Sequence, residues 1–372
     1  MDLLTTIVAF IALLAILVLV HELGHFIVAK RAGITVQEFG FGFPPRITSV
    51  VWRGTRYSIN WIPLGGFVKM LGVDGDAEAD KMRQQGLSET AVERAMEGAF
   101  NRKPIWVRLA VLLAGVAMNL LLAVAVFAVA LSLPVPEERG PLRVTEVQAD
   151  SPAEAADLRI DDLIVSADGR TFVASRDLIR YVRSRAGEPV ALSIERGEET
   201  IALSVVPRDL TPEQVAAGLG AVGFSWRATA MGELPPVAAN PWDAIVKGAT
   251  ETGTIAWQIP GALVDAVGGL LGLNPDAPPP VGPIGIAEET GRLLQEPLVR
   301  QLAWIGLLSI NLAVLNVLPF PPLDGGRIAV VLVEAIRRRR MRPEREALIY
   351  LTGVAVLITL VILISIRDVQ NL

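Results

Sequence analysis

Four long apolar runs constrain this chain more than any other feature of its sequence. They extend from Leu3 to about Ala29, from Ile105 to about Leu133, from about Leu302 to Leu318, and from about Leu348 to Ile366. A bilayer core takes about 20 helical residues, so each run approaches or exceeds the length of a membrane-spanning helix. Hydrophobic residues make up 52% of the 372 residues. The sequence therefore predicts a polytopic α-helical membrane protein with room for one or two small domains.

Basic residues set the expected orientation of these runs. They follow the first run, flank the start of the second and separate the third from the fourth: Lys30, Arg31, Arg102, Lys103, Arg108 and six arginines between Arg337 and Arg345. Because Lys and Arg concentrate in cytoplasmic loops, we expect these ends in the cytoplasm and both chain termini outside. The first run has no basic start, so we expect it to be retained rather than cleaved as a signal peptide. The net charge of −5 does not indicate nucleic-acid binding.

The only two histidines of the chain lie together inside the first run. His21 and His25 flank Glu22 in the string HELGH. A spacing of four places both imidazoles on one face of a helix, which suits a shared tetrahedral Zn²⁺, and Glu22 is placed to take a proton from water. The alternative is a structural polar cluster, but polar groups in lipid are costly unless paired or functional. The sequence predicts a metal site roughly 8–14 Å inside the cytoplasmic end of this helix.

A further metal ligand is expected from a different membrane segment. The chain has no cysteine, so the ligand must be nitrogen or oxygen. Asp324 follows a proline-rich break at the end of the third run, and ionisable groups beside such breaks are functional candidates. A plain Leu-Asp-Gly-Gly turn is the other interpretation, and spacing alone leaves both open. Glu334 is the other nearby acid, and we expect it to pair with the arginine run.

Between the first two runs lies a segment rich in β-branched and aromatic residues. Ile47–Trp52 and Arg56–Trp61 flank an Arg53-Gly54-Thr55 turn, which predicts a β-hairpin. It is cytoplasmic by the orientation above and apolar enough to dip into the membrane. Its function would be an exposed edge strand that captures an extended substrate. The alternative is an amphipathic hairpin that only covers a helix end.

Two further regions lie between the second and third runs. Residues 140–207 alternate strand-like and helical patterns, which predicts a small β-sheet with two helices, of a size that binds peptides. Residues 208–300 contain amphipathic helical patterns around 241–273 and proline-rich stretches such as Pro278-Pro279-Pro280. We expect these helices on the outer membrane surface and assign no fold to this region.

Taken together, these motifs resemble the site-2 protease family of intramembrane zinc metallopeptidases. The resemblance rests on HELGH, on the NxxPxPxLDG string from Asn316 to Gly325, and on the Gly66–Met70 segment after the hairpin. It is greatest for the RseP-type bacterial group, which releases sigma factors by cutting membrane-bound anti-sigma proteins. It extends over nearly the whole chain, since residues 102–119, 140–207 and 282–286 resemble the group's second span, PDZ domain and segment before the third span.

The resemblance implies a fold with four transmembrane helices, a cytoplasmic membrane-associated β-hairpin and an extracytoplasmic PDZ-like α+β domain. The implied boundaries are 1–31 for the first transmembrane helix, 32–103 for the cytoplasmic region, 104–133 for the second helix, 140–207 for the PDZ-like domain, 208–300 for a linker with amphipathic helices, 301–336 for the third helix and 346–367 for the fourth. The implied location is the bacterial cytoplasmic (inner) membrane, with the active site towards the cytoplasm.

The resemblance also implies a role for individual residues. His21, His25 and Asp324 would bind Zn²⁺, and Glu22 would be the general base. Substrate would be held by residues of the proline-rich segment and of the hairpin: Asn316, Pro319, Ile47, Thr48, Ser49, Val50, Ser58, Ile59 and Asn60. The implied partners are single-span membrane proteins such as anti-sigma factors, and the lipid bilayer itself.

This chain departs from the family pattern in places that avoid the metal residues. Ala156-Asp157-Leu158 and Asp161-Asp162 stand where the PDZ pattern usually has glycines, which weakens any prediction of C-terminal carboxylate binding. Val116 stands where relatives often have proline. Two other functions remain as hypotheses, a non-catalytic peptide-binding membrane protein and a zinc or proton transporter. The presence of both Glu22 and Asp324 favours a protease over a non-catalytic binding protein, and the lack of internal repeats favours a protease over a transporter.

Overall fold

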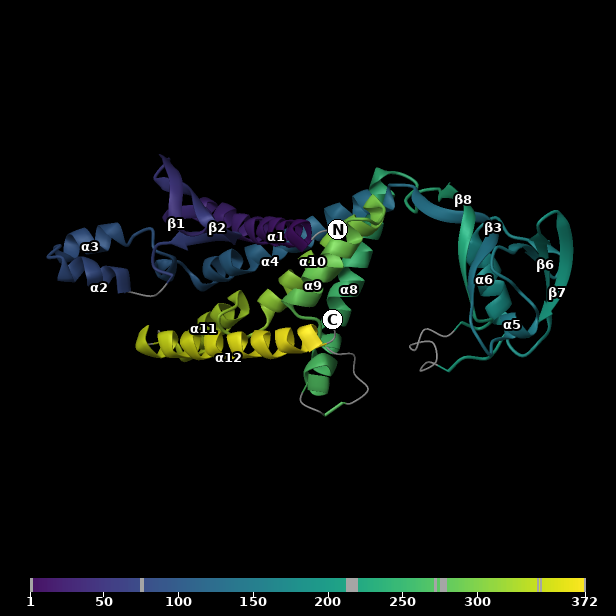
Figure 1. Cartoon of the computed structure of the whole chain (residues 1–372). Helices are drawn as coiled ribbons and strands as arrows, with labels where there is room; N and C mark the ends of the chain where they lie inside the picture. The colour runs from purple at the N-terminus through teal and green to yellow at the C-terminus, as the bar shows by residue number, and fades with distance from the viewer. Residues whose placement is uncertain are drawn as a thin grey trace. The chain divides into compact units, whose positions relative to one another are not determined.

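The computed structural model describes residues 3–73, 77–211, 220–270, 273–274, 280–339, 341 and 343–370. The chain forms two compact units (Figure 1). One combines Met1–Leu133 with Val237–Leu372, and the other is Pro134–Pro236. Two arginines of the basic run, Arg340 and Arg342, and the prolines 278 and 279 lie outside the described residues.

Four helices of the first unit are long and apolar enough to cross a membrane, as the sequence predicted. Among the described residues they are α1 (Leu3–Arg31), α4 (Ile105–Leu131), α10 (Leu298–Val317) and α12 (Pro343–Gln370). The third predicted segment, 301–336, is two helices. Helix α10 ends before Pro319, and α11 (Asp324–Arg337) begins after the prolines. Proline lacks the N–H that a continuing helix needs, so the chain breaks here.

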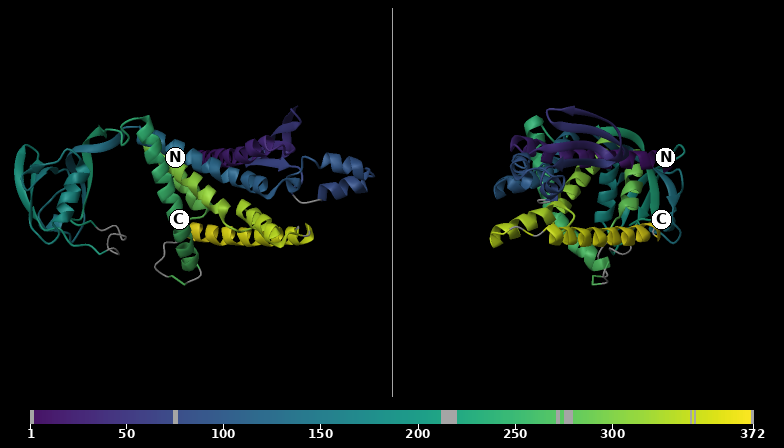
Figure 2. Two further views of the ribbon diagram at one scale, coloured as in Figure 1. Left: turned by 180° about the vertical axis from the view of Figure 1, so that it is seen from behind. Right: turned by 90° about the vertical axis from the view of Figure 1, so that its left-hand side faces the viewer.

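Helices α1, α10 and α8 (Pro241–Leu270) all pack against α4. Figure 2 shows these helices from two further directions. Phe127 and Ala123 of α4 form one apolar cluster with Ile310 of α10, and Ile255 and Ile259 of α8 pack against it. The expected location of this region on the outer membrane surface stays a prediction for α8. One side of α8 packs against other helices of the unit, while Trp242, Trp257 and Val264 of the same helix are exposed.

The predicted hairpin forms a more elaborate sheet than the sequence indicated. Strands β1 (Val36–Trp52) and β2 (Thr55–Met70) are each long enough to pair with the other twice. Residues 38–41 pair with residues 56–59 on one side and with residues 66–69 on the other. Residues 56–59 pair in turn with residues 48–51 on their other side. The two outer segments are therefore 48–52 and 66–70. Residues 38–41 and 56–59 are interior, with backbone partners on both sides.

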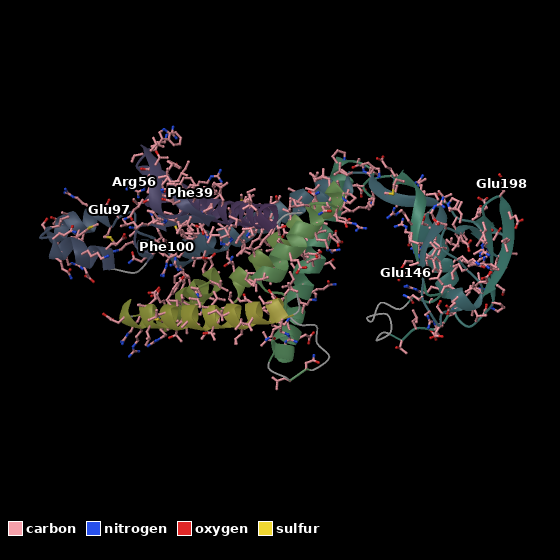
Figure 3. All side chains as sticks on the ribbon, in the orientation of Figure 1. Phe39, Arg56, Glu97, Phe100, Glu146 and Glu198 are labelled. Carbon is pink, nitrogen blue, oxygen red and sulfur yellow. The ribbon has the colours of Figure 1, made fainter. Side chains whose placement is uncertain are left out.

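The base of this sheet packs against α1. Phe39, labelled in Figure 3, lies 5.0 Å from Phe26 of α1, measured between ring centroids. The turn is Arg53-Gly54, with φ angles of 49° and 75°. Thr55, expected in the turn, begins β2, and its buried hydroxyl donates to the Val36 carbonyl oxygen at 2.9 Å. Side chains near the turn, including Val50 and Trp52, are exposed.

The remaining helices of the first unit are short. They are α2 (Ala77–Gln84), α3 (Glu89–Ala95), a 3₁₀ turn (Phe100–Arg102) and α9 (Pro283–Leu293). Helix α3 carries a charged sequence with Glu89, Glu93 and Arg94. Ser88 caps it by accepting a hydrogen bond from the Ala91 N–H.

The second unit is an antiparallel sheet with the strand order β7-β6-β4-β3-β8 and a short β5 beside β4. The strands are β3 (Val135–Val147), β4 (Leu163–Ala167), β5 (Arg170–Thr171), β6 (Val190–Arg196), β7 (Glu199–Val205) and β8 (Phe224–Leu234), with helices α5 (Pro152–Ala155) and α6 (Ser175–Ser184). Leu142, Ile164 and Ile194 are buried in its core. The sheet extends beyond the predicted 140–207, because β8 pairs with β3 along most of its length.

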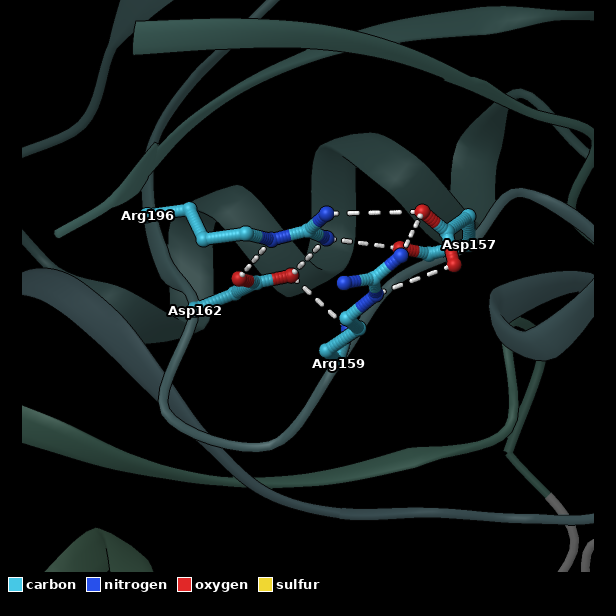
Figure 4. A network of polar contacts seen from close by, with 4 residues as sticks. All are labelled: Asp157, Arg159, Asp162 and Arg196. Atoms are coloured by element: carbon cyan, nitrogen blue, oxygen red, sulfur yellow. Dashed lines mark hydrogen bonds and ion pairs between the residues drawn. The ribbon is translucent and has the colours of Figure 1, made fainter. Parts of the chain in front are cut away.

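A buried ion pair ties the chain before β4 to the end of β6 (Figure 4). Asp162 is 1% exposed, and its carboxylate accepts hydrogen bonds from Arg196 Nε at 2.7 Å and Nη2 at 2.8 Å. The Arg159 backbone N–H adds a third at 2.7 Å. Burial acts against the charged carboxylate, but these hydrogen bonds outweigh it, so the pKa of Asp162 lies below its usual range.

Candidate metal centre

Three side chains from two separate helices converge at one point in the first unit. His21 Nε2 lies 2.8 Å from Asp324 Oδ2, and His25 Nε2 lies 3.0 Å from the same oxygen. The two Nε2 atoms are 3.1 Å apart. Tetrahedral Zn²⁺ with nitrogen and oxygen ligands at about 2.0 Å places neighbouring ligand atoms about 3.3 Å apart. The three atoms are therefore arranged as the ligands of one zinc ion would be.

Asp324 reaches this point because the chain folds back after α10. It is the first residue of α11, and its side chain is 18% exposed. A Cβ on Gly325 would lie only 2.1 Å from the Leu318 carbonyl oxygen, so this close approach requires glycine. The Tyr350 hydroxyl of α12 donates to the Pro322 carbonyl oxygen at 3.0 Å and accepts from Arg327 Nε at 2.6 Å. Helix α12 thus holds the loop that presents the carboxylate.

Helix α4 forms the wall of the site opposite the histidines. The Val111 carbonyl oxygen lies 2.7 Å from His25 Nδ1, which donates to it, so His25 Nε2 is free to accept a metal. One turn later, a Cβ on Gly115 would lie 2.5 Å from His25 Nε2 and 2.6 Å from His21 Nε2. A glycine is required because any side chain would occupy the space of the ligand atoms.

Glu22 lies beside the converging atoms without being one of them. His21, Glu22 and His25 each place a ligand atom within 4.8 Å of the others. The Val68 backbone of β2 makes a hydrogen bond with the Glu22 carboxylate. A Cβ on Gly66 would lie 3.8 Å from Glu22 Cγ. The outer segment 66–70 of the sheet therefore runs past the carboxylate that the sequence predicted as the general base.

The structure distributes the predicted substrate residues over three places. Asn316 is half-buried in the last turn of α10, and Pro319 is exposed in the loop that follows. Four residues lie on or beside the outer segment of β1 with exposed side chains: Ile47, Thr48, Ser49 and Val50. Three others belong to β2: Ser58, Ile59 and Asn60.

The β2 residues of this group belong to the sheet interior. Ser58 and Ile59 are paired on both sides, and the Asn60 amide donates to the carbonyl oxygens of Phe41 and Gly42 at 3.2 and 3.1 Å. They offer no free backbone edge to a substrate strand. The outer segment 66–70 is an edge of the sheet that the sequence did not predict. Its first residues, Gly66 and Phe67, were identified only through their resemblance to a segment of the family.

Among the described residues, the ion-pair partner of Glu334 is not an arginine of the run predicted for it. Its carboxylate lies 2.9 Å from Arg108 Nη1 of α4, and both side chains are largely buried, at 11% and 12% exposed. Helix α11 packs against α4, which brings this sequence-distant arginine to Glu334. Gly115 was also missed as a site residue. Its signal in the sequence was the resemblance of residues 102–119 to a family span.

Comparison with known proteins gives matches along the whole chain. The model of peptidase family M50 matches residues 9–360. A putative zinc metalloprotease of Agrobacterium fabrum is 32% identical over 370 residues, which cover 98% of this chain and 96% of that protein. The zinc metalloprotease RasP of Oceanobacillus iheyensis is 29% identical over 433 residues, covering 99% of each. Among solved structures, the PDZ domain of the SdrC-like protein of Listeria monocytogenes is 24% identical, covers 24% of this chain and 87% of that one, and has a TM-score of 0.20.

Proposed function

Because the chain belongs to peptidase family M50 and is a zinc metalloprotease, we propose that it hydrolyses peptide bonds within transmembrane segments of other membrane proteins. The observation that carries this proposal is the location of the metal residues. His21 and His25 lie on a helix apolar enough to cross a membrane, and Asp324 lies at a break between two helices of the same unit. Family membership sets aside the two other hypotheses, a transporter and a non-catalytic binding protein.

His21, His25 and Asp324 would hold the zinc. When bound, zinc supplies Lewis-acid activation of a substrate carbonyl and of a water molecule. Glu22 takes the proton of the attacking water and returns it to the amine nitrogen that leaves when the peptide bond breaks. Val111 and the Pro322 loop keep the ligands oriented while this happens, since they hold His25 and the segment before Asp324 through hydrogen bonds.

A substrate helix must unwind before it can be cut. Its peptide groups are hydrogen-bonded within the helix, and a separated strand in lipid needs new partners. The outer segment 66–70 offers such partners beside Glu22, and the exposed segment from Ile47 to Trp52 offers a second edge. An extended substrate added to segment 66–70 would pass next to the general base.

The orientation in the membrane follows from the distribution of basic residues. Lys30 and Arg31 at the end of α1 support a cytoplasmic position for that helix end, so the metal centre would lie on the cytoplasmic side and the Pro134–Pro236 unit outside. The substrates are single-span membrane proteins of the anti-sigma type, and the outer unit regulates their access. Co-expression with candidate single-span proteins tests this, since native enzyme should remove the intact substrate.

Glu22→Gln is the direct test of the catalytic proposal. The variant should retain zinc, because Glu22 is not among the three converging ligands, and should lose cleavage of a model membrane substrate. Glu93→Gln, at an exposed position of α3, is the matched control and should keep full activity. Full activity of Glu22→Gln would contradict the mechanism.

A further inference from the structure

A buried amide of α4 lies beside the first histidine of the metal centre. Asn119 is 0% exposed, and its Nδ2 is 3.4 Å from His21 Nδ1. Its backbone carbonyl oxygen accepts a hydrogen bond from Ser309 Oγ of α10 at 2.8 Å, which fixes this turn of α4 between the two helices. Asn119 Oδ1 is buried and has no hydrogen-bond partner among the described residues.

The amide in this orientation conflicts with metal binding. An N–H donated to His21 Nδ1 requires that nitrogen to be unprotonated, and a neutral imidazole then carries its proton on Nε2. Nε2 is the atom that faces Asp324 and His25, and a protonated nitrogen cannot hold zinc. Nothing else supports this orientation of the amide, because Oδ1 forms no hydrogen bond that would keep it there.

Exchanging the oxygen and nitrogen of the amide removes the conflict. The two ends are almost equal in size and are assigned only through their hydrogen bonds. We propose that Asn119 presents Oδ1 to the Nδ1–H of His21 and acts as a positioning residue for that ligand. His21 Nε2 then offers its lone pair to zinc, as His25 Nε2 does through the Val111 carbonyl. Helix α4 thereby selects the metal-binding tautomer of both histidines.

This role predicts a specific pattern of metal affinities. Outer hydrogen-bond acceptors of ligating histidines are typically worth roughly 10–100-fold in metal affinity. Asn119→Leu, which keeps the volume and removes the acceptor, should lower zinc affinity by about that factor. Asn119→Asp keeps an acceptor oxygen and should retain affinity at least equal to that of the native protein. Asn119→Ala should lose affinity as Asn119→Leu does.

The experiment is chelator competition for zinc with the full-length protein in detergent. Asn311→Leu is the matched control, because its amide donates to the Leu307 carbonyl oxygen of the same helix, and zinc affinity should be unchanged. Melting of the metal-free proteins separates a packing defect from a ligand defect. Native affinity in Asn119→Leu and Asn119→Ala, or equal losses in the Leu, Ala and Asp variants, would overturn the proposal. The readout is independent of peptide cleavage, so it stands apart from the proposed substrates.

Discussion

Gly115→Ala is the smallest change that should disable the metal centre. The added Cβ would lie 2.5 Å from His25 Nε2 and 2.6 Å from His21 Nε2. Reaching even 3.0 Å needs a shift of about 0.5 Å by each ring, and zinc sites hold ligand distances to within about 0.2 Å. His25 cannot retreat freely, because its Nδ1 is bonded to Val111 at 2.7 Å.

The expected loss is therefore in zinc binding and not in folding. Alanine is more favourable than glycine in a helix by about 1 kcal/mol, so α4 itself should be at least as stable. We expect zinc affinity to fall by at least roughly 10-fold, the lower end of the effect of disturbing ligand orientation. Cleavage of a model substrate should fall in proportion.

The assay compares zinc content after dialysis against a graded chelator, with thermal unfolding of the metal-free protein as a fold control. Gly253→Ala in α8 is the matched control, because a Cβ at that position would meet nothing within 4 Å. It should keep native zinc affinity and activity. If Gly115→Ala retained zinc as tightly as Gly253→Ala, the described approach of α4 to the imidazoles would be refuted.

Three further predictions concern the supports of the fold. Tyr350→Phe removes a hydroxyl whose hydrogen bond holds the loop before Asp324. Losing that hydrogen bond costs about 1 kcal/mol, so zinc affinity measured by chelator titration should fall about fivefold. Arg108→Met leaves Glu334 buried without its partner and should cost about 3 kcal/mol in urea unfolding, which Glu334→Leu in the same chain should largely restore. Because the pKa of Asp162 is lowered in the folded protein, its pairing with Arg196 stabilises the second unit above pH of about 4, and this stabilisation is lost as the pH falls further. In Asp162→Asn, hydrogen-exchange protection of the second unit should therefore fall less steeply with decreasing pH than in the native protein. Unchanged acid sensitivity in that variant would show that other carboxylates control it.

Interactions within one helix were readable from the sequence. The i, i+4 pair His21 and His25 depends only on helical periodicity, and the four apolar helices depend only on length and composition. The break before Asp324 followed from proline chemistry. The HELGH spacing also predicted the zinc, and the family resemblance supplied the protease activity, because its motifs combine residues from several of these segments.

Contacts between distant segments were decided by the tertiary structure. The sequence could not choose between Asp324 as a ligand and as a turn residue, since 299 residues separate it from His25. The double pairing of β1 with β2, the pairing of Glu334 with Arg108 and the packing of α8 on α4 also escaped prediction. Local patterns specify which face of a helix or strand is apolar, but which partner covers that face depends on the packing of the whole unit. Gly115 shows this most clearly, because its lack of a side chain acquires meaning only once α4 lies against the two imidazoles.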